Sequence, residues 1–563
     1  MSTYVPTADQ NVIREKRFTP SLTSAAHHAI EPNEHLYGED VIPHHTLVRQ
    51  MEARHIAMIS IGGAIGTGLF LGSGTSLADG GPLGLWLGYI FVGSICYAMM
   101  VSLGEMVSFL PIPGGHIALA ERFVSPALSF AMGWIYWYNW VIAIPAELSA
   151  AAVIINYWIS ESRVNNAVWI TICIIVVIGI NAMGARAYGE AEFWFASIKV
   201  LTIIGLIILG ILLDLGVGPS HDRIGLRYLK HPGLFIQYHK IPGTTGRFVG
   251  WWIVVTQAPY SFIGTEIVAI AAGEAKNPRK TILKAIKRVY VRILLFYILG
   301  TLIIGLLVPS NNMDLGVQSN AFSSPFVIAI RNAGISGLPS VINAAILTSA
   351  WSAASSYLYT ASRAIYGLAK SRNAPSFFTH TRDSGLPYYA VAFCGAFTAL
   401  AYMGLSSGSN KVFGWFSNMT SIAGLMTWCG IGITYVRFHA GLKVQEIDRD
   451  RLPFKSPLQP FLGWYVVIST IVIGFFSGFS VFLKDDWIFL KDDWSTAKFV
   501  TNYIPYILFP MLYLFARYFM YRDAPPVAAS DMDFVSGIAE IEAESYEEDP
   551  PKTVVERVWK WLM

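Results

Sequence analysis

Stretches of about twenty apolar residues with few charges recur along most of this chain, and they constrain its fold more than any other feature. A helix of about twenty apolar residues is long enough to cross the hydrocarbon core of a bilayer. Of the 563 residues, 54% are hydrophobic and only 14% are charged, which is more apolar surface than a soluble protein of this size needs. The predicted spans are 55–78, 83–108, 126–158, 166–184, 190–213, 250–272, 289–308, 338–370, 388–406, 411–436, 461–483 and 499–520. The pattern therefore predicts an all-α integral membrane protein with about twelve transmembrane helices.

Polar segments flank this apolar region on both sides. Residues 1–50 are rich in Ser, Thr, Pro and His and are predicted to be a disordered tail, residues 51–522 a transmembrane domain, and residues 523–563 a second tail. The N-terminus has no apolar core of a cleavable signal peptide, so the first span is expected to act as the anchor. Basic residues gather in alternate connections between the spans, which predicts that both tails are cytoplasmic. The basic loop at 214–249 is an exception, but long loops carry little weight in this rule.

Several classes of function lack their sequence signals. The four cysteines lie in apolar runs without paired spacing, which is typical of small buried side chains rather than disulfides or metal ligands. A nucleotide-binding P-loop is missing, which argues against an ATP-driven pump, and no His, Cys and carboxylate cluster has metal-ligand spacing. We therefore expect no enzyme activity, no catalytic residue, no metal, no cofactor and no nucleic-acid partner.

The first span is interrupted by glycines. Four of them, Gly62, Gly63, Gly66 and Gly68, lie within seven residues of Ile61–Phe70. Each glycine inside a helix costs about 1 kcal/mol relative to alanine. A broken helix is tolerated in hydrocarbon where its freed N–H and C=O groups face a protein cavity or a ligand, and a carboxylate suits the N-terminus of the half-helix. The alternative is close helix packing through small residues.

The sixth span has an interruption of its own. Pro259, Gly264 and Glu266 fall within eight residues of an apolar run. Proline removes a backbone hydrogen bond, and glycine permits backbone angles that other residues avoid. Broken segments in the first and sixth spans, five positions apart in the order of spans, are typical of a five-plus-five inverted repeat whose binding site lies between them, here followed by two extra C-terminal helices. This pairing favours the binding-site interpretation of the first run over simple packing.

Three of the ionisable residues inside the predicted spans are candidates for function, because an ionised residue at the centre of a span costs roughly 2.5–3.5 kcal/mol. Glu266 adjoins the second break, so it could hold a substrate amine or cap a freed backbone group. Lys199 lies seven residues after Glu192, and it could exchange a proton or extend to the cytoplasmic interface. Glu147 follows Pro145 in the third span, and it could line the pocket or pair with a buried partner.

The chain resembles the fungal amino-acid permeases of the amino acid–polyamine–organocation superfamily from about Leu47 to Arg522. The resemblance rests on ordered stretches that include Arg54–Phe70, Leu103–Met106, Ile142–Glu147, Gly264–Glu266, Ala272–Lys280, Ala361–Ala364 and Leu368–Pro375. It implies the inverted-repeat fold and proton-coupled uptake of amino acids across the plasma membrane. One departure from the pattern is a seven-residue tandem duplication within Phe482–Ser495, for which we have no functional account.

The resemblance also implies roles for individual residues. The substrate carboxylate would bind backbone N–H groups around Gly66, Thr67 and Gly68, and its amine would meet carbonyls near Ile61–Ala64 and Phe262–Gly264. Phe262 matches the aromatic residue that covers the pocket, and Lys199 matches a fifth-helix lysine that stands where sodium-coupled relatives hold sodium. The expected substrate-binding set is Ala64, Ile65, Gly66, Thr67, Gly68, Glu147, Phe262, Ile263, Gly264, Thr265 and Glu266, with Lys199 and Glu266 expected in proton coupling.

The expected function is a secondary active symporter for neutral or broad-range L-amino acids, possible substrates including proline. The segments Pro145–Ala151 and Phe262–Glu266 look closer to such permeases than to dedicated basic ones. Two alternatives stay open: an amino-acid sensor with weak transport, and a transporter of a related amine such as a polyamine or carnitine. The expected partners are the amino acid, protons and the lipid bilayer, and ubiquitin-ligase machinery could act on the tails, for example at Lys16.

Overall fold

A computed structural model describes residues 65–112, 114–238, 241–267, 289–315, 324–482, 493–536 and 538. These residues belong to the larger of two units into which the chain divides, His45–Met563. Outside them lie Ala64, Lys16, most of the Phe482–Ser495 duplication, and the C-terminal residues 539–563. Within this described part, every regular element is a helix and none is a strand.

The first half of the domain begins at the glycine-rich run. A π-helical turn, η2 (Gly68–Gly72), leads into α2 (Ser73–Phe109), which is kinked at Gly81 and Pro82, where Gly81 has φ 76°. This left-handed angle suits glycine, and it marks the kink between two predicted spans. Helix α2 therefore contains the end of the first span and the whole of the second. The helices that follow are α3 (Gly115–Phe123), α4 (Pro126–Ile155), α5 (Asn166–Ala182), α6 (Ala185–Asp214), α7 (Arg227–Lys230), α8 (Gly243–Gln257) and α9 (Pro259–Phe262).

The second half begins with a continuous helical stretch at Val289–Leu307, formed by η4 (Ile293–Leu299) and α12 (Gly300–Leu307). The longer elements after it are α13 (Pro325–Asn332), α14 (Leu338–Lys370), α15 (Tyr388–Ala396), η7 (Phe397–Met403), α16 (Gly404–Ser407), α17 (Ser409–Val444), α18 (Phe461–Phe475), α19 (Asp493–Phe515) and η10 (Ala516–Met520). Short turns of 3-10 helix are η5 (Met313–Leu315), η6 (Ser376–Thr379), η8 (Arg449–Arg451) and η9 (Phe479–Phe482).

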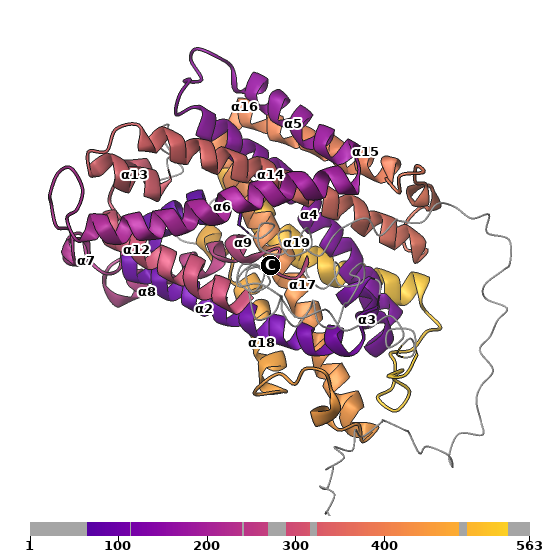
Figure 1. Cartoon of the computed structure of the whole chain (residues 1–563). Coiled ribbons are helices and arrows are strands. Elements are labelled where there is room, and N and C mark those ends of the chain that lie inside the picture. The colour runs from indigo at the N-terminus through magenta and orange to yellow at the C-terminus, as the bar shows by residue number, and fades with distance from the viewer. Residues whose placement is uncertain are drawn as a thin grey trace, which may run out of the picture. The chain divides into compact units, whose positions relative to one another are not determined.

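The core is organised around α4, which packs against both α14 and α17. Almost all of its side chains are buried, including Trp140 and Glu147. In Figure 1, α5, α15 and α16 lie together along one side of the bundle, and α2, α8 and α12 lie together along another. Helix α14 carries buried hydroxyl groups from Ser349, Ser352 and Ser355, which give the core polar contacts.

Eight helical stretches are long and apolar enough to cross a membrane: Gly68–Phe109, Pro126–Ile155, Ala185–Asp214, Val289–Leu307, Tyr388–Ser407, Ser409–Val444, Phe461–Phe482 and Thr496–Met520. Each of the twelve spans predicted from the sequence contains helical residues in the described part of the chain. The all-helical membrane fold is therefore confirmed at this level. The count of twelve crossings, the five-plus-five repeat and the two extra C-terminal helices stay predictions.

A segment beyond the last long helix returns to the bundle. Phe534 is buried, and its ring lies 5.2 Å from that of Phe123 on α3 and 5.7 Å from that of Phe438 on α17. Arg122 forms an ion pair of 3.0 Å with Asp533 and donates to its carbonyl. The segment thus connects two helices that are far apart in the sequence.

Candidate functional site

The first segment is described from Ile65 onwards, and there a side chain from α4 lies against a backbone N–H group. The N–H of Thr67 points at both carboxyl oxygens of Glu147, each 3.4 Å away, and the Tyr260 hydroxyl donates to Oε1 over 3.0 Å. On the other side, the Ser349 hydroxyl donates to the carbonyl of Ile65 over 3.2 Å. A carboxyl group at the N-terminus of a half-helix is favoured by the unpaired N–H groups and by the helix dipole.

Close approach at this break depends on glycine. A Cβ atom on Gly66 would lie 2.8 Å from Glu147 Oε1 and 3.3 Å from the Tyr357 hydroxyl. A Cβ atom on Gly68 would lie 2.8 Å from the ring of Tyr260. The small residues therefore permit tight packing, as one interpretation of the sequence required, and this packing also brings a carboxyl group and two tyrosine hydroxyls to the broken backbone.

The second break is formed by Ile263 and Gly264. Helix α9 ends at Phe262, Ile263 is extended with ψ 141°, and Gly264 has φ 102°, an angle at which glycine is unstrained. The N–H of Gly264 donates to both carboxyl oxygens of Glu266, at 3.2 and 3.4 Å. The predicted interruption is thus present, and Glu266 caps a freed backbone group, which was one of its two expected roles.

Glu266 has further donors around it. The indole N–H of Trp428 on α17 lies 3.3 Å from Oε2, and the hydroxyl of Thr265 lies 3.5 Å from the same oxygen. Thr265 in turn contacts the sulfur of Cys96, one of four cysteines that are all free and buried, as the sequence predicted. Glu266 is fully buried, so these donors replace the water that a carboxyl group would otherwise require.

Phe262 lies in an aromatic cluster next to this break. Its ring stacks on Tyr297 with centroids 4.4 Å apart and lies 5.8 Å from the ring of Tyr89. The side chain is fully buried. It does not line the cavity described below, whereas its neighbours Tyr260 and Ser261 do.

Lys199 is buried in the core rather than extended to an interface. Its Nζ lies 3.8 Å from Glu192 Oε1 on the same helix, and the other oxygen of Glu192 accepts a bond of 2.5 Å from Ser352 on α14. Both charged side chains are almost completely inaccessible. The structure therefore places Lys199 in a polar connection between α6 and α14.

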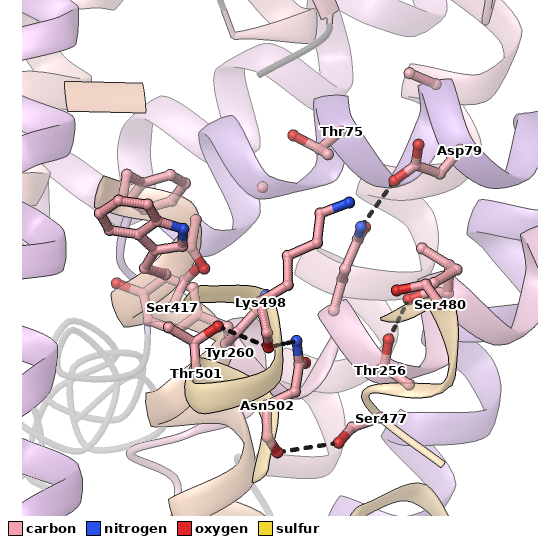
Figure 2. A pocket seen from close by; sticks show the side chains of 18 of the residues that line it. Thr75, Asp79, Thr256, Tyr260, Ser417, Ser477, Ser480, Lys498, Thr501 and Asn502 are labelled. Carbon is pink, nitrogen blue, oxygen red and sulfur yellow. Dashed lines mark hydrogen bonds between the residues drawn. The ribbon is translucent and has the colours of Figure 1, made fainter. Parts of the chain in front are cut away.

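A cavity of about 480 Å³ reaches the two broken segments from one end of the bundle. Gly68 of the first segment and Tyr260 and Ser261 of the second line its inner part. Figure 2 shows polar side chains from α2, α8, α17 and α19 around it. Other lining residues lie before α8, on the first half of α17 and on α19, and include Gln237, Tyr238, Lys411, Asn418 and Lys498. This is the end of the molecule that the sequence predicts to be extracellular.

Two polar residues near the breaks were missed by the sequence reasoning. Asn139 on α4 is fully buried, and neither atom of its amide has a hydrogen-bond partner among the described residues. Its oxygen lies 3.7 Å from the Cβ position of Gly424, against which Ile263 packs. Thr420, one helical turn before Gly424, also has a buried hydroxyl without a partner in the described part of the chain. An uncharged polar residue within an apolar run gives little signal in a single sequence.

Comparison with known proteins identifies the family. The profile described as "Amino acid permease" matches residues 55–529. A proline-specific permease of Emericella nidulans is 40% identical over 534 residues, which cover 93% of this chain and 95% of the relative. A dicarboxylic amino acid permease of Saccharomyces cerevisiae is 41% identical over 81% of this chain and 75% of its own length. A lysine-specific permease of the same yeast is 39% identical over 91% and 82%. The chain therefore belongs to the amino acid permease family.

Proposed function

We propose that this chain is a proton-coupled symporter of the plasma membrane, with both termini cytoplasmic, which imports neutral or broad-range L-amino acids, proline included. Membership of the permease family supports amino-acid transport. The similar relatives are named for proline, for dicarboxylic amino acids and for lysine, at 40%, 41% and 39% identity. Sequence identity to these relatives therefore does not distinguish between substrate classes, so the substrate class is argued from the residues of the site.

The observation that carries the proposal is the contact of the Thr67 N–H with the carboxyl group of Glu147. It supports a carboxylate-binding backbone at the first break, because a substrate carboxylate has the same acceptor chemistry as the glutamate. In the proposal this carboxylate binds N–H groups around Gly66, Thr67 and Gly68. The substrate amine then meets carbonyl groups released at the second break, between Phe262 and Gly264.

Proton coupling is assigned to the buried pair of Lys199 and Glu192. Burying two ions in a membrane protein is costly unless they neutralise each other, and removal of one proton from such a pair changes its interactions with α14 through Ser352. A membrane potential supplies about 2.3 kcal/mol per charge per 100 mV, so one proton can drive accumulation of a neutral amino acid. Glu266, which caps the second break, is the other candidate for this role.

The test is uptake of radiolabelled proline by permease-deficient fungal cells that express the chain, with and without a protonophore. Neutral, acidic and basic amino acids serve as competitors. We expect concentrative uptake that the protonophore abolishes, and we expect Lys199→Met to lose accumulation while retaining competition by amino acids. Uptake that survives the protonophore would contradict symport. A correctly delivered protein without any uptake would contradict the transport function and favour a sensor.

A further inference from the structure

Charged side chains line the 480 Å³ cavity, and the proposed transport mechanism assigns them no role. Asp79, at the end of the first span, is half-buried and lines one wall. Gln257 on α8 donates to Asp79 Oδ2 over 2.8 Å, and the oxygen of the same amide accepts a bond of 2.8 Å from Ser76. These two bonds link the acidic group of Asp79 on α2 to α8.

Two lysines lie on the walls formed by the C-terminal helices. Lys498 on α19 is half-buried, and Figure 2 shows its side chain extending into the cavity towards the wall of Thr75 and Asp79. Lys411, near the beginning of α17, is exposed and lines the same cavity. Among the described residues of the lining, Asp79, Lys411 and Lys498 are the charged ones, and within this set positive side chains outnumber negative ones.

The three charged side chains lie in the same cavity as the two broken segments. The cavity continues inward to Gly68, Tyr260 and Ser261, which belong to the two breaks. The three charged side chains therefore line the same cavity as residues of the two broken segments, and a solute inside it lies near both. Charges that line a concave wall of low dielectric act more strongly on a solute than the same charges on an open surface.

We propose that this cavity is a vestibule that selects amino acids by side-chain charge, in which Lys498 and Lys411 attract carboxylate groups and hold back cationic side chains, and Asp79 meets the α-ammonium group. The inference rests on the proposed function, since it takes the solute to be an amino acid. It narrows the substrate class to amino acids with neutral or acidic side chains. A volume of about 480 Å³ holds one amino acid together with water.

The selection is electrostatic, and it has a defined physical range. In a cavity of about 480 Å³, a solute lies close to the walls compared with the Debye length of about 8 Å at physiological ionic strength, so salt screens the lysines only in part. Reversing one of these charges, as in Lys498→Glu, turns an attraction for a carboxylate into a repulsion. We expect this to change the preference between basic and acidic amino acids by about tenfold.

The experiment measures binding to the purified full-length protein in lipid nanodiscs and uptake by the same variants in permease-deficient cells. Proline, lysine and glutamate are the probes. We expect Lys498→Glu to raise the affinity for lysine relative to glutamate by about tenfold, with a smaller shift for the exposed Lys411→Glu. Lys230→Glu is the matched control, because this exposed lysine of α7 undergoes the same charge change and does not line the cavity. It should leave the ratio of affinities as in the parent protein.

The outcomes separate the two proposals. If Lys498→Glu and Lys411→Glu bind proline but leave the ratio of lysine to glutamate affinity unchanged, the vestibule proposal is wrong and amino-acid transport stands. An equal shift in Lys230→Glu would also overturn it, because general surface charge would then explain the result. If the parent protein binds none of the three amino acids in nanodiscs, both proposals fail together.

Discussion

The two broken segments satisfy their freed backbone groups in different ways. At the first break, the acceptor for the Thr67 N–H is Glu147, which lies 80 residues away on α4 and also binds Tyr260. At the second break, the acceptor for the Gly264 N–H is Glu266, two residues further along the same segment. The backbone contact of Glu147 thus joins two elements that are distant in the sequence, whereas the backbone contact of Glu266 lies within one segment, and each carboxyl group also accepts a bond from a side chain of a further element.

This difference indicates that Glu266 is a structural cap, whereas the contact of Glu147 with Thr67 can be replaced by a substrate carboxylate. The cap of Gly264 survives any movement of the segment as a unit, because donor and acceptor are joined by only two residues. The contact between Thr67 and Glu147 persists only while η2, α4 and α9 stay together, and its N–H···O distances of 3.4 Å are long for hydrogen bonds. We therefore expect Glu266 to maintain the fold and Glu147 to yield its position to a substrate carboxylate.

Gly66→Val tests the first break and should have the largest effect. Its Cβ atom would lie 2.8 Å from Glu147 Oε1 and 3.3 Å from the Tyr357 hydroxyl, and its methyl groups would add to this crowding. Overpacking costs about 1–3 kcal/mol, so we expect proline affinity to fall by about 100-fold and uptake to be lost. Competition binding on the purified protein measures the change.

The control for this variant is Gly179→Val on α5. A Cβ atom on Gly179 meets nothing within 4 Å, so the same substitution adds the same side chain without crowding. We expect affinity close to that of the parent protein. Normal affinity in Gly66→Val would mean that the first break does not hold the carboxylate, and the comparison between the two breaks would lose its functional meaning.

Glu266→Ala against Glu147→Ala tests the division of roles. Without Glu266, the buried N–H groups of Gly264 and Trp428 lose their acceptor, and we expect the free energy of unfolding to fall by about 2 kcal/mol. Glu147→Ala should cost less, about 1 kcal/mol, because the contacts of Glu147 with the Thr67 N–H are long.

Thermal unfolding of the purified variants measures these losses of stability, and proline binding to the same samples measures the losses of substrate affinity. Glu266→Gln is the control, because its amide oxygen still accepts a bond from Gly264 and should recover part of the loss. Equal destabilisation by the two alanine variants, with equal effects on proline affinity, would show that Glu147 and Glu266 have the same role.

The sequence predicted the elements of this site better than the contacts between them. Glycine and proline within an apolar run located the break at Ile263 and Gly264, whereas the first glycine run up to Ala64 lies outside the described residues. Glu147, Lys199 and Glu266 were conspicuous because each is a charged residue within an apolar run. These signals are local, since each depends on a residue type that is costly in a membrane helix. The predicted spans overlap the observed helices because apolar composition is also a local signal.

The contacts between distant helices could not be predicted in this way. That Glu147 meets Thr67, rather than another buried group, depends on the rotation and depth of α4 relative to the first segment. Lys498 gave no signal either, because a lysine beside an exterior loop reads as a solvated residue until the cavity is known. Glu192 was noted only for its spacing from Lys199, although the structure brings the two within 3.8 Å.

A smaller effect should distinguish the hydrogen bonds themselves. Trp428→Phe removes one donor to Glu266, and Tyr260→Phe removes one donor to Glu147. Each single change also alters packing, so each is combined with the alanine variant of its glutamate in a double-mutant cycle, which isolates the energy of the pair. We expect about 1 kcal/mol for both pairs in the absence of amino acid.

Saturating proline should then separate the two cycles. If a substrate carboxylate takes the place of Glu147 at the Thr67 N–H, the coupling between Tyr260 and Glu147 changes on binding. The coupling between Trp428 and Glu266 should stay at about 1 kcal/mol, because Glu266 keeps its place on the Gly264 N–H. A change in the Trp428 cycle instead would reverse the assignment, since the second break would then be the one that rearranges around the substrate.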